Sequence, residues 1–191
     1  MNEAQLRADV CQSQSIERIH VDEHSLRFKL HLEATQYVYK LASEGTWPDV
    51  CMVHYKLMTL DDDPGIFRTW EVYVSDEEDG EKNWCPSAMH IPALIKEWEY
   101  YCSLVRTNKE YFGNDLESEC VNQYYHFLVI HPFSDGNGRT GRLMYNALRL
   151  SVGLPWHTFT TDIHGLYVGR LREYEKDFKK EYQDKYDPDP M

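Results

Sequence analysis

The sequence predicts one mostly helical domain with a small β-hairpin, and three observations support this fold class. Apolar residues recur at helical spacing along most of the chain. One short segment alone is rich in β-branched and aromatic residues, as strands are. Breaks containing Gly and Pro divide the helical pattern into ordinary helix lengths. With 191 residues and a 42% hydrophobic fraction, the chain is long enough to bury one sizeable core.

The first part of the chain, up to about Ser43, is expected to be helical. The apolar residues at helical spacing are Leu26, Leu30, Ala34, Tyr37, Val38 and Leu41. Residues 44–48 form a helix stop, because Gly45 would lie just past the helix end and Pro48 lies beyond it. A short helix is expected over residues 54–60, before the acidic break at 61–65.

The segment 67–74 is expected to be the strand, because it combines aromatic and β-branched residues. The turn-like acidic run 76–80 follows it, and a pairing strand is expected near Trp84. These elements would form the hairpin.

From Ile91 onward the helical pattern returns. One helix is expected before the break at Gly113, and the next ends at His131, because Pro132 disfavours helical geometry in the residue before it. A third helix is expected over about 138–152. A last, highly charged helix is expected over about 165–184.

The formal net charge of −12 makes the chain a poor general ligand for nucleic acid or an anionic membrane. A bound phosphate group would therefore need a local cluster of donors. The chain has no apolar stretch of membrane-spanning length and a polar N-terminus. Its five cysteines are scattered without a CxxC pair. We therefore expect a cytoplasmic protein with reduced thiols and no structural zinc site.

The residues that carry chemistry lie between His131 and Arg142. A helix ends there, a glycine-containing turn follows, and a new helix begins. Gly136 and Gly138 let the backbone approach a ligand closely, and Asn137 tolerates left-handed geometry. Successive N–H groups in such a turn at a helix N-terminus favour anion binding.

Four side chains in this segment have the chemistry of phosphoryl or nucleotidyl transfer. His131 can accept a proton near neutral pH, and Asp135 is an oxygen ligand suited to Mg²⁺. Arg139 and Arg142 lie three residues apart on the same side of the new helix and offer planar forks for phosphate oxygens. Taken singly, each has an ordinary explanation as a cap, a turn residue or a solvated charge. Their occurrence together within twelve positions favours a catalytic site.

This segment resembles the Fic-family signature, His-x-Phe-x-Asp/Glu-Gly-Asn-Gly-Arg-x-x-Arg. Every fixed position is met, and the matching residues are His131, Phe133, Asp135, Gly136, Asn137, Gly138, Arg139 and Arg142. Segments 64–68, 88–98 and 143–153 also resemble the family. The resemblance implies a helical Fic-like domain with a β-hairpin flap over the active site.

By this resemblance, the chain transfers AMP from ATP to a hydroxyl of a target protein and is an adenylyltransferase. His131 would deprotonate a Ser, Thr or Tyr hydroxyl, and Asp135 would hold Mg²⁺ against the α- and β-phosphates. The residues that would cradle the phosphates are Gly136, Asn137, Gly138 and Arg139. Arg142 would hold the γ-phosphate, and Phe133 would anchor the loop in the core.

The resemblance also implies a docking surface for the target protein. The flap residues would bind the target backbone as an added strand, and they are Thr69, Trp70, Glu71, Val72, Tyr73 and Val74. Tyr174 on the last helix is a weaker candidate for packing on adenine, with ordinary core packing as the alternative.

A built-in inhibitory segment is suggested near the N-terminus. Residues Ser13 to Glu17 resemble the inhibitory signature Ser/Thr-x-x-x-Glu-Gly/Asn, with Arg18 where Gly or Asn is expected. Glu17 would occupy the donors of Arg142 and misalign ATP. The alternative is a surface glutamate on a helix. This divides the chain into an N-terminal helical segment, 1–45, and a catalytic core, 46–191.

Several alternatives stay open at this level. The same site could transfer UMP or another nucleotide, phosphate or phosphocholine, although Gly138, where the kinase-like branch has lysine, disfavours phosphate transfer. It could also remove AMP with the help of Glu17, or serve as a non-catalytic nucleotide-binding interaction module. The partners implied are ATP and a protein with an exposed hydroxyl residue, with no nucleic acid or membrane. Self-modification and a homodimer are compatible with the family.

Overall fold

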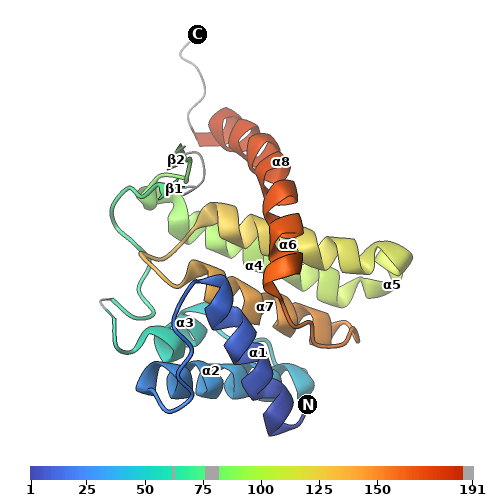
Figure 1. Ribbon diagram of the computed structural model, residues 1–191. Helices are drawn as coiled ribbons and strands as arrows, with labels where there is room; N and C mark the ends of the chain where they lie inside the picture. Colours follow the sequence, from blue (N-terminus) through green and yellow to red (C-terminus); the bar gives the residue numbers. More distant parts are fainter. Residues whose placement is uncertain (62, 76–81, 187–191) are drawn as a thin grey trace.

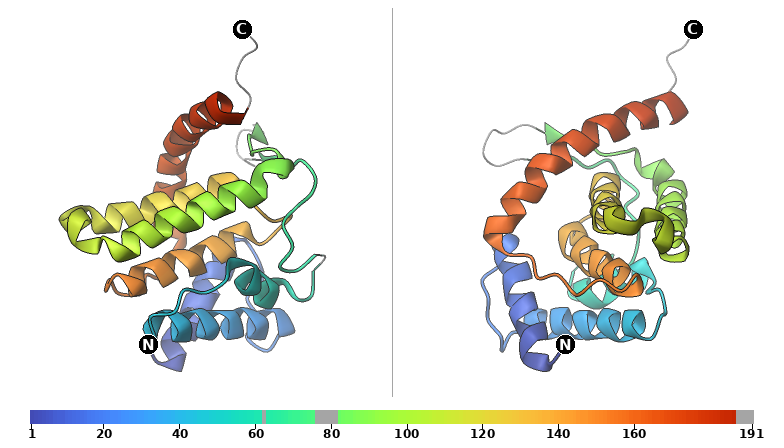
Figure 2. Two further views of the ribbon diagram at one scale, coloured as in Figure 1. Left: turned by 180° about the vertical axis from the view of Figure 1, so that it is seen from behind. Right: turned by 90° about the vertical axis from the view of Figure 1, so that its right-hand side faces the viewer.

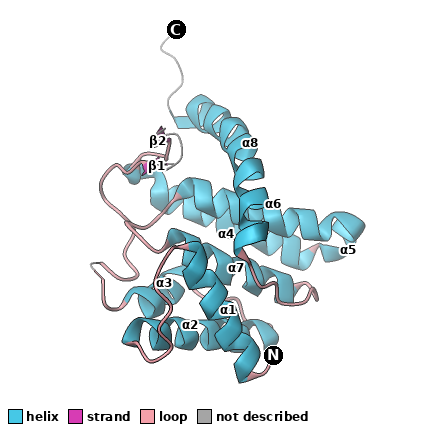
Figure 3. Ribbon diagram, viewed as in Figure 1, coloured by secondary structure: helices cyan, strands magenta, loops and turns pink. Residues whose placement is uncertain are grey.

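The computed structural model describes residues 1–61, 63–75 and 82–186 (Figure 1). Helices dominate this part of the chain, which confirms the mostly helical prediction (Figure 3). The α-helices are α1 (Glu3–Ile16), α2 (Leu26–Ser43), α3 (Val50–Met58), α4 (Ile91–Thr107), α5 (Lys109–Phe112), α6 (Leu116–Ile130), α7 (Asn137–Ser151) and α8 (Thr161–Tyr186). Short 3-10 turns cover Ala88–His90 and Gly113–Asp115.

Side-chain caps determine where the first three helices begin. The Asn2 side chain accepts from the Gln5 N–H while the Gln5 side chain accepts from the Asn2 N–H, which forms a capping box for α1. The Ser25 side chain caps α2 by accepting from the Phe28 N–H, and the Asp49 side chain caps α3 by accepting from the Met52 N–H. The part of the chain up to Ser43, which was expected to be helical, consists of the two helices α1 and α2. The helix expected over 54–60 begins at Val50 instead, because Asp49 supplies its cap.

Helix α7 lies at the centre of the molecule. Helices α4 and α6 run along one side of it, and α2 and α3 lie on the other (Figures 1 and 2). Helix α8 crosses α6, and α1 packs against α2, α7 and α8. Twelve of the fifteen residues of α7 are buried. The arginines that begin α7 are therefore carried by the most enclosed helix of the fold.

The hairpin is much shorter than expected. Strand β1 (Val74–Ser75) pairs antiparallel with β2 (Lys82–Asn83), with Val74 opposite Asn83. The prediction of a strand over 67–74 is wrong, because residues 67–73 adopt no strand. Their hydrogen bonds go elsewhere: the Arg68 N–H donates to the carbonyl of Pro132 over 2.9 Å. The turn expected at 76–80 lies outside the described residues.

The later helices agree closely with the sequence. Helix α6 ends at Ile130, next to His131 and Pro132, and α7 begins at Asn137, one residue earlier than expected. Helix α8 is longer than expected at both ends. None of the five cysteines forms a disulfide bond. Among the described residues, no helix combines the length and apolarity that a membrane crossing requires.

Candidate active site

His131 lies at the C-terminal cap of α6 in a left-handed conformation, with φ 48° and ψ 60°. Its N–H donates to the carbonyl of Phe127 over 3.1 Å, and its own carbonyl accepts from Arg68 Nε over 2.8 Å. A left-handed conformation of a residue other than glycine costs about 1–2 kcal/mol. The hydrogen bonds on both sides of His131 hold it there despite this cost.

The imidazole of His131 is only partly exposed. Burial, aided by the positive charge of Arg68, lowers its pKa to about 4, while the charges of Asp135 and Glu17 act in the opposite direction. The ring is therefore neutral at pH 7. A neutral imidazole has a free nitrogen lone pair, as a general base requires.

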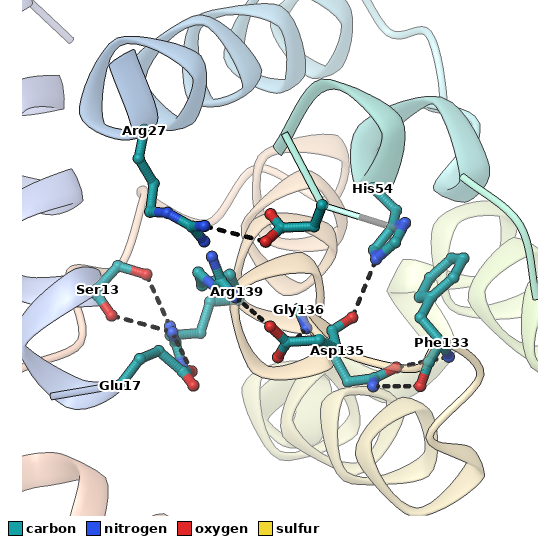
Figure 4. Close-up of polar contacts among 11 residues, drawn as sticks. Ser13, Glu17, Arg27, His54, Phe133, Asp135, Gly136 and Arg139 are labelled. Atoms are coloured by element: carbon teal, nitrogen blue, oxygen red, sulfur yellow. Dashed lines mark hydrogen bonds and ion pairs between the residues drawn. The ribbon is translucent and has the colours of Figure 1, made fainter. Parts of the chain in front are cut away.

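The loop between α6 and α7 is closed by Asn137. Its side-chain amide donates to the Phe133 carbonyl over 2.8 Å, and its oxygen accepts from the Phe133 N–H over 2.9 Å (Figure 4). The ring of Phe133 is fully buried, as the core-anchor interpretation expects. Because both ends of the Asn137 amide are used inside the loop, a phosphate contact from this residue is left to its backbone N–H.

Asp135 faces solvent at the tip of this loop, with its side chain 70% exposed. Its Oδ1 accepts from the Gly136 N–H over 2.6 Å, and its Oδ2 lies 3.3 Å from Arg139 Nη2 (Figure 4). Gly136 itself has a φ of 74°, which favours glycine. The carboxylate is thus oriented by its own loop while remaining accessible to a ligand.

The residues present fit a magnesium ion of the kind that nucleotides carry. In the described parts of the chain, no cluster of three or more His, Cys, Asp or Glu side chains could hold a metal alone. Mg²⁺ on polyphosphates is usually held by one or two carboxylates, with phosphate oxygens and water completing the octahedron. The single exposed Asp135 suits that arrangement.

The N-terminus of α7 offers donors for an anion. No side chain caps this end, and its first helical hydrogen bond runs from the Thr140 N–H to the Gly136 carbonyl over 2.9 Å. The preceding N–H groups have no acceptor within the helix. Arg139 is buried close by, and its Nε has no hydrogen-bond partner among the described residues. A buried donor left unpaired costs about 1–3 kcal/mol, which favours a bound acceptor.

Arg142 is held by the end of α1. Its Nη2 lies 2.7 Å from Glu17 Oε1, and the same guanidinium donates to the hydroxyl and carbonyl of Ser13 over 3.0 and 3.1 Å (Figure 4). The contact predicted between Glu17 and Arg142 is therefore present. Ser13, the first residue of the same short signature, binds Arg142 as well.

Helix α1 ends in the geometry that the signature's Gly or Asn would supply. Arg18 has a φ of 54°, its N–H donates to Ser15, and the N–H of Ile19 donates to Gln14. These two bonds form a Schellman motif. Arg18 thus replaces Gly or Asn without changing the turn, at the cost of a left-handed non-glycine residue.

Glu17 reaches Arg142 across the backbone of Gly138. A Cβ added to Gly138 would lie 2.4 Å from Glu17 Oε1, which is too close for real atoms. A side chain at position 138 would therefore displace the Glu17 carboxylate from its position beside Arg142. The side chain of Glu17 stays 30% exposed, so the ion pair lies at a boundary that solvent can reach.

The other predicted site residues lie farther away. Tyr174 on α8 lies beside the rings of Tyr125 and His126 on α6. It lines a hollow of about 250 Å³ between α4, α6 and α8. No residue of the 131–142 motif lines this hollow. Of the flap residues, Thr69, Trp70, Glu71 and Tyr73 are exposed and Val72 is partly exposed. Glu71 accepts from the Ser87 hydroxyl and the Ala88 N–H.

Sequence reasoning missed two residues that hold the loop. Arg68 is buried and donates to the carbonyls of His131, Trp70 and Pro86. His54 on α3 is buried and contacts Asp135 and Phe133 (Figure 4). Both lie more than 60 residues from the motif, so no local pattern connects them with it. For Arg68 the sequence offers one signal, its place in the segment 64–68 that resembles the family.

The model of the Fic/DOC family matches residues 46–148, more than half of the chain and the whole 131–142 motif. The chain belongs to the Fic/DOC family.

Curated relatives carry a consistent name. The chain is 28% identical over 162 residues to "Protein adenylyltransferase Fic" of Drosophila grimshawi, an alignment covering 81% of this chain and 31% of that protein. It is 26% identical over 160 residues to the protein of the same name in Aedes aegypti, covering 81% and 30%. The chain thus spans about a third of the length of these relatives.

Solved structures show the same fold. A Fic domain-containing signalling protein from Bacteroides thetaiotaomicron superposes with a TM-score of 0.72 at 18% identity, covering 90% of this chain and 72% of that one. A Fic family protein from Desulfovibrio desulfuricans gives a TM-score of 0.57 at 19% identity, covering 93% and 55%. The helical arrangement is therefore Fic-like.

Proposed function

We propose that this chain is a protein adenylyltransferase that transfers AMP from ATP to a hydroxyl side chain of a target protein. The observation that carries the proposal is the N-terminus of α7. Two buried arginines, one with an unpaired Nε, lie there beside an exposed aspartate and follow a neutral histidine. The names of the curated relatives support the same reaction.

The transfer requires one proton acceptor and one anion site. His131 takes the proton from a Ser, Thr or Tyr hydroxyl, and the hydroxyl oxygen forms a bond to the α-phosphorus of ATP. The bond from that phosphorus to the bridging oxygen breaks, and pyrophosphate leaves with its electron pair. Arg139 and the N–H groups of Asn137 and Gly138 face the phosphate charge, while the Gly136 N–H stays with the Asp135 carboxylate. Arg142 holds the γ-phosphate and so determines which phosphorus faces the hydroxyl.

Asp135 is the residue that would hold Mg²⁺ when the nucleotide is bound. The ion would neutralise charge on the α- and β-phosphates. The Gly136 N–H keeps the Asp135 carboxylate in place in the free protein. The ion therefore meets a ligand that is already oriented.

The segment 1–45 acts as an inhibitory arm on the core formed by 46–191. Glu17 and Ser13 occupy the donors of Arg142 that the γ-phosphate needs. While α1 is docked, ATP binds with its γ-phosphate displaced and its α-phosphate turned away from His131. Release of Glu17 restores the productive position, and self-modification of the chain is then expected.

The segment 69–74 is proposed as the flap that binds the target backbone as an added strand. The exposed side chains of Thr69, Trp70, Glu71 and Tyr73 support a binding role. Adenine packing on Tyr174 is less favoured, since that ring packs beside α6 within the 250 Å³ hollow.

The alternatives use the same site. Transfer of UMP would differ only in base recognition, which the 131–142 motif does not determine. Glu17 could instead orient a water molecule for removal of AMP. A purely nucleotide-binding interaction module would not need His131 as a neutral base.

The test compares four proteins: the parent, Glu17→Gly, His131→Ala and the double variant. Each is incubated with Mg²⁺ and nucleoside triphosphates labelled at either the α- or the γ-phosphate, together with a lysate as a source of targets. We expect α-label from ATP on protein with Glu17→Gly and none with the double variant. Label that survives the loss of His131, or that comes from the γ-phosphate, would contradict the proposal.

A further inference from the structure

His54 on α3 connects the motif loop with the chain that leads to the flap. Its side chain is 1% exposed. One ring nitrogen, Nε2, lies 3.0 Å from the carbonyl oxygen of Asp135 (Figure 4). The other, Nδ1, lies 2.8 Å from the backbone nitrogen of Gly65. Asp135 lies 81 residues from His54 and Gly65 lies 11 residues from it, and the imidazole joins the two segments.

These two partners determine the tautomer of His54. The Gly65 N–H can only donate, so Nδ1 carries no proton and accepts. The Asp135 carbonyl can only accept, so Nε2 carries the proton and donates. Both nitrogens are satisfied in the neutral Nε2–H form, and no other protonation state satisfies both.

The bond to Asp135 controls a whole peptide plane. The carbonyl of Asp135 and the N–H of Gly136 belong to one planar unit and rotate together. The Gly136 N–H donates to Asp135 Oδ1 over 2.6 Å. Holding the carbonyl at one edge of this plane therefore orients the carboxylate at the other edge.

The ring itself also supports the loop. It stacks on Phe133 with centroids 3.7 Å apart and an interplanar angle of 4°. A Cβ on Gly136 would lie 2.8 Å from Met58 Sδ and 3.3 Å from His54 Nε2. Helix α3 thus forms the floor against which residues 133–136 pack.

We propose that His54 is a positioning residue for nucleotide transfer, acting through the 135–136 peptide plane on the Asp135 carboxylate. This inference rests on the proposed function above. Its hydrogen bond with Gly65 ties the same imidazole to the segment 65–70, which Arg68 anchors to the carbonyl of His131. The two contacts of His54 hold the flap segment and the Asp135 carboxylate in fixed positions relative to each other.

Substitutions at position 54 separate the two hydrogen bonds, and each is made in the Glu17→Gly background. His54→Gln retains a donor that reaches the Asp135 carbonyl, whereas His54→Asn retains only an acceptor near Gly65. His54→Phe keeps a flat ring on Phe133 without either bond. Loss of a residue that orients a metal ligand costs about 10- to 100-fold in metal affinity or activity. We expect a loss of that size for the Asn and Phe variants, with a raised Mg²⁺ requirement and a smaller change in the KM for ATP.

The Gln variant should stay close to the unsubstituted rate. His90→Phe is the matched control, because the His90 ring also stacks on an aromatic ring, that of Tyr186, and hydrogen-bonds through one nitrogen, but to Tyr182. It should leave transfer unchanged. Equal losses in all three His54 variants, or transfer unchanged in Asn and Phe, would overturn the positioning role.

A second readout is independent of activity. Nitrogen-15 NMR of the imidazoles in the ligand-free parent should show His54 as the neutral Nε2–H tautomer at pH 7. Hydrogen exchange of the Gly136 amide should be faster in His54→Asn than in His54→Gln. An Nδ1–H tautomer or equal exchange would refute the proposal even if Glu17→Gly proved inactive. Absence of transfer in Glu17→Gly itself would instead count against the proposed function.

Discussion

Arg18 shows how a single residue sets the end of the inhibitory helix. It adopts a φ of 54° at the position after the Glu17 cap, where the related signature has Gly or Asn. The Schellman hydrogen bonds around it fix where Glu17 points. Arg18 therefore preserves the direction of Glu17 at some expense in stability.

Replacing Arg18 with Gly should tighten the inhibitory contact. Removing the Cβ relieves the left-handed strain, and after the entropy of glycine in the unfolded chain is counted we expect a gain of about 0.5–1 kcal/mol. If the gain in free energy stabilises the docked position of α1, the rate of basal AMP transfer should fall about two- to five-fold. Thermal unfolding measures the gain in stability, and labelled-ATP assays measure the rate of basal transfer.

Arg18→Ala is the control for this change, because it removes the guanidinium but keeps the Cβ. It should not share the gain in stability. A lower melting temperature for Arg18→Gly than for Arg18→Ala would show that the left-handed geometry is not a source of strain.

The sequence alone identifies some residues of the site and misses others. The motif residues lie in one local loop whose glycines, Asn137 and arginines have a fixed spacing, so the sequence alone identifies them. His54 and Arg68 hold that loop through hydrogen bonds across 81 and 63 residues. Such contacts depend on how α3 and α6 pack together, which no local pattern encodes.

At the scale of elements, the contact between α1 and α7 depends on the absence of a side chain. Glu17 lies over Gly138, where a Cβ would meet its carboxylate at 2.4 Å and Arg142 Nη1 at 3.2 Å. Gly138 lies within the first turn of α7, where alanine would otherwise favour the helix by about 0.5–1 kcal/mol. The effect of Gly138→Ala should therefore change sign with Glu17.

A double-mutant cycle tests this coupling. In the parent, Gly138→Ala should lower the free energy of unfolding, because overpacking costs about 1–3 kcal/mol. Undocking of α1 would relieve the overpacking but would lose the contact between Glu17 and Arg142. In the Glu17→Gly background the same substitution should be neutral or stabilising. Denaturant unfolding of the four proteins gives the coupling energy. Additive effects would mean that Glu17 does not lie over Gly138 in solution.

The sequence predicts the helices better than it predicts the hairpin, and the reason is physical. Apolar periodicity reports the buried face of a helix directly, as the ends of α6 and α7 show. The segment 67–73 has strand-like composition, but Arg68 directs its hydrogen bonds to the loop at 131–132 instead of to a neighbouring strand.

At the scale of the whole molecule, buried histidines make stability depend on pH. Burial lowers the pKa of His31 to about 3 and that of His126 to about 4, and it lowers the pKa of His131 to about 4. Between pH 6.5 and 4 these groups bind protons in the unfolded chain and not in the folded one. Their contribution to stability is complete above pH 6.5 and is lost as the pH falls toward 4.

Asp9 on α1 acts in the opposite direction. Burial raises its pKa to about 6, so between pH 6 and 3.8 the folded state binds a proton that the unfolded state does not. One such group does not offset three histidines. We expect the free energy of unfolding to fall by more than about 1 kcal/mol per pH unit from pH 6 to pH 5.

Urea unfolding between pH 7.5 and 5 measures this slope. His126→Phe should flatten it, because that variant removes one of the three groups without touching the motif loop. A free energy of unfolding that is constant or rises on acidification over this range would contradict the burial of these histidines.

We propose that Glu17, through the ion pair between α1 and α7, restrains an AMP-transferring site formed by His131 and the N-terminus of α7. The most direct measurement is intact-protein mass spectrometry of Glu17→Gly after incubation with ATP and Mg²⁺, alongside the parent and the Glu17→Gly/His131→Ala variant.

We predict an added AMP on a Ser, Thr or Tyr hydroxyl of Glu17→Gly, much less on the parent, and none on the double variant. Modification of Glu17→Gly no greater than that of the parent, or modification that persists without His131, would contradict the account.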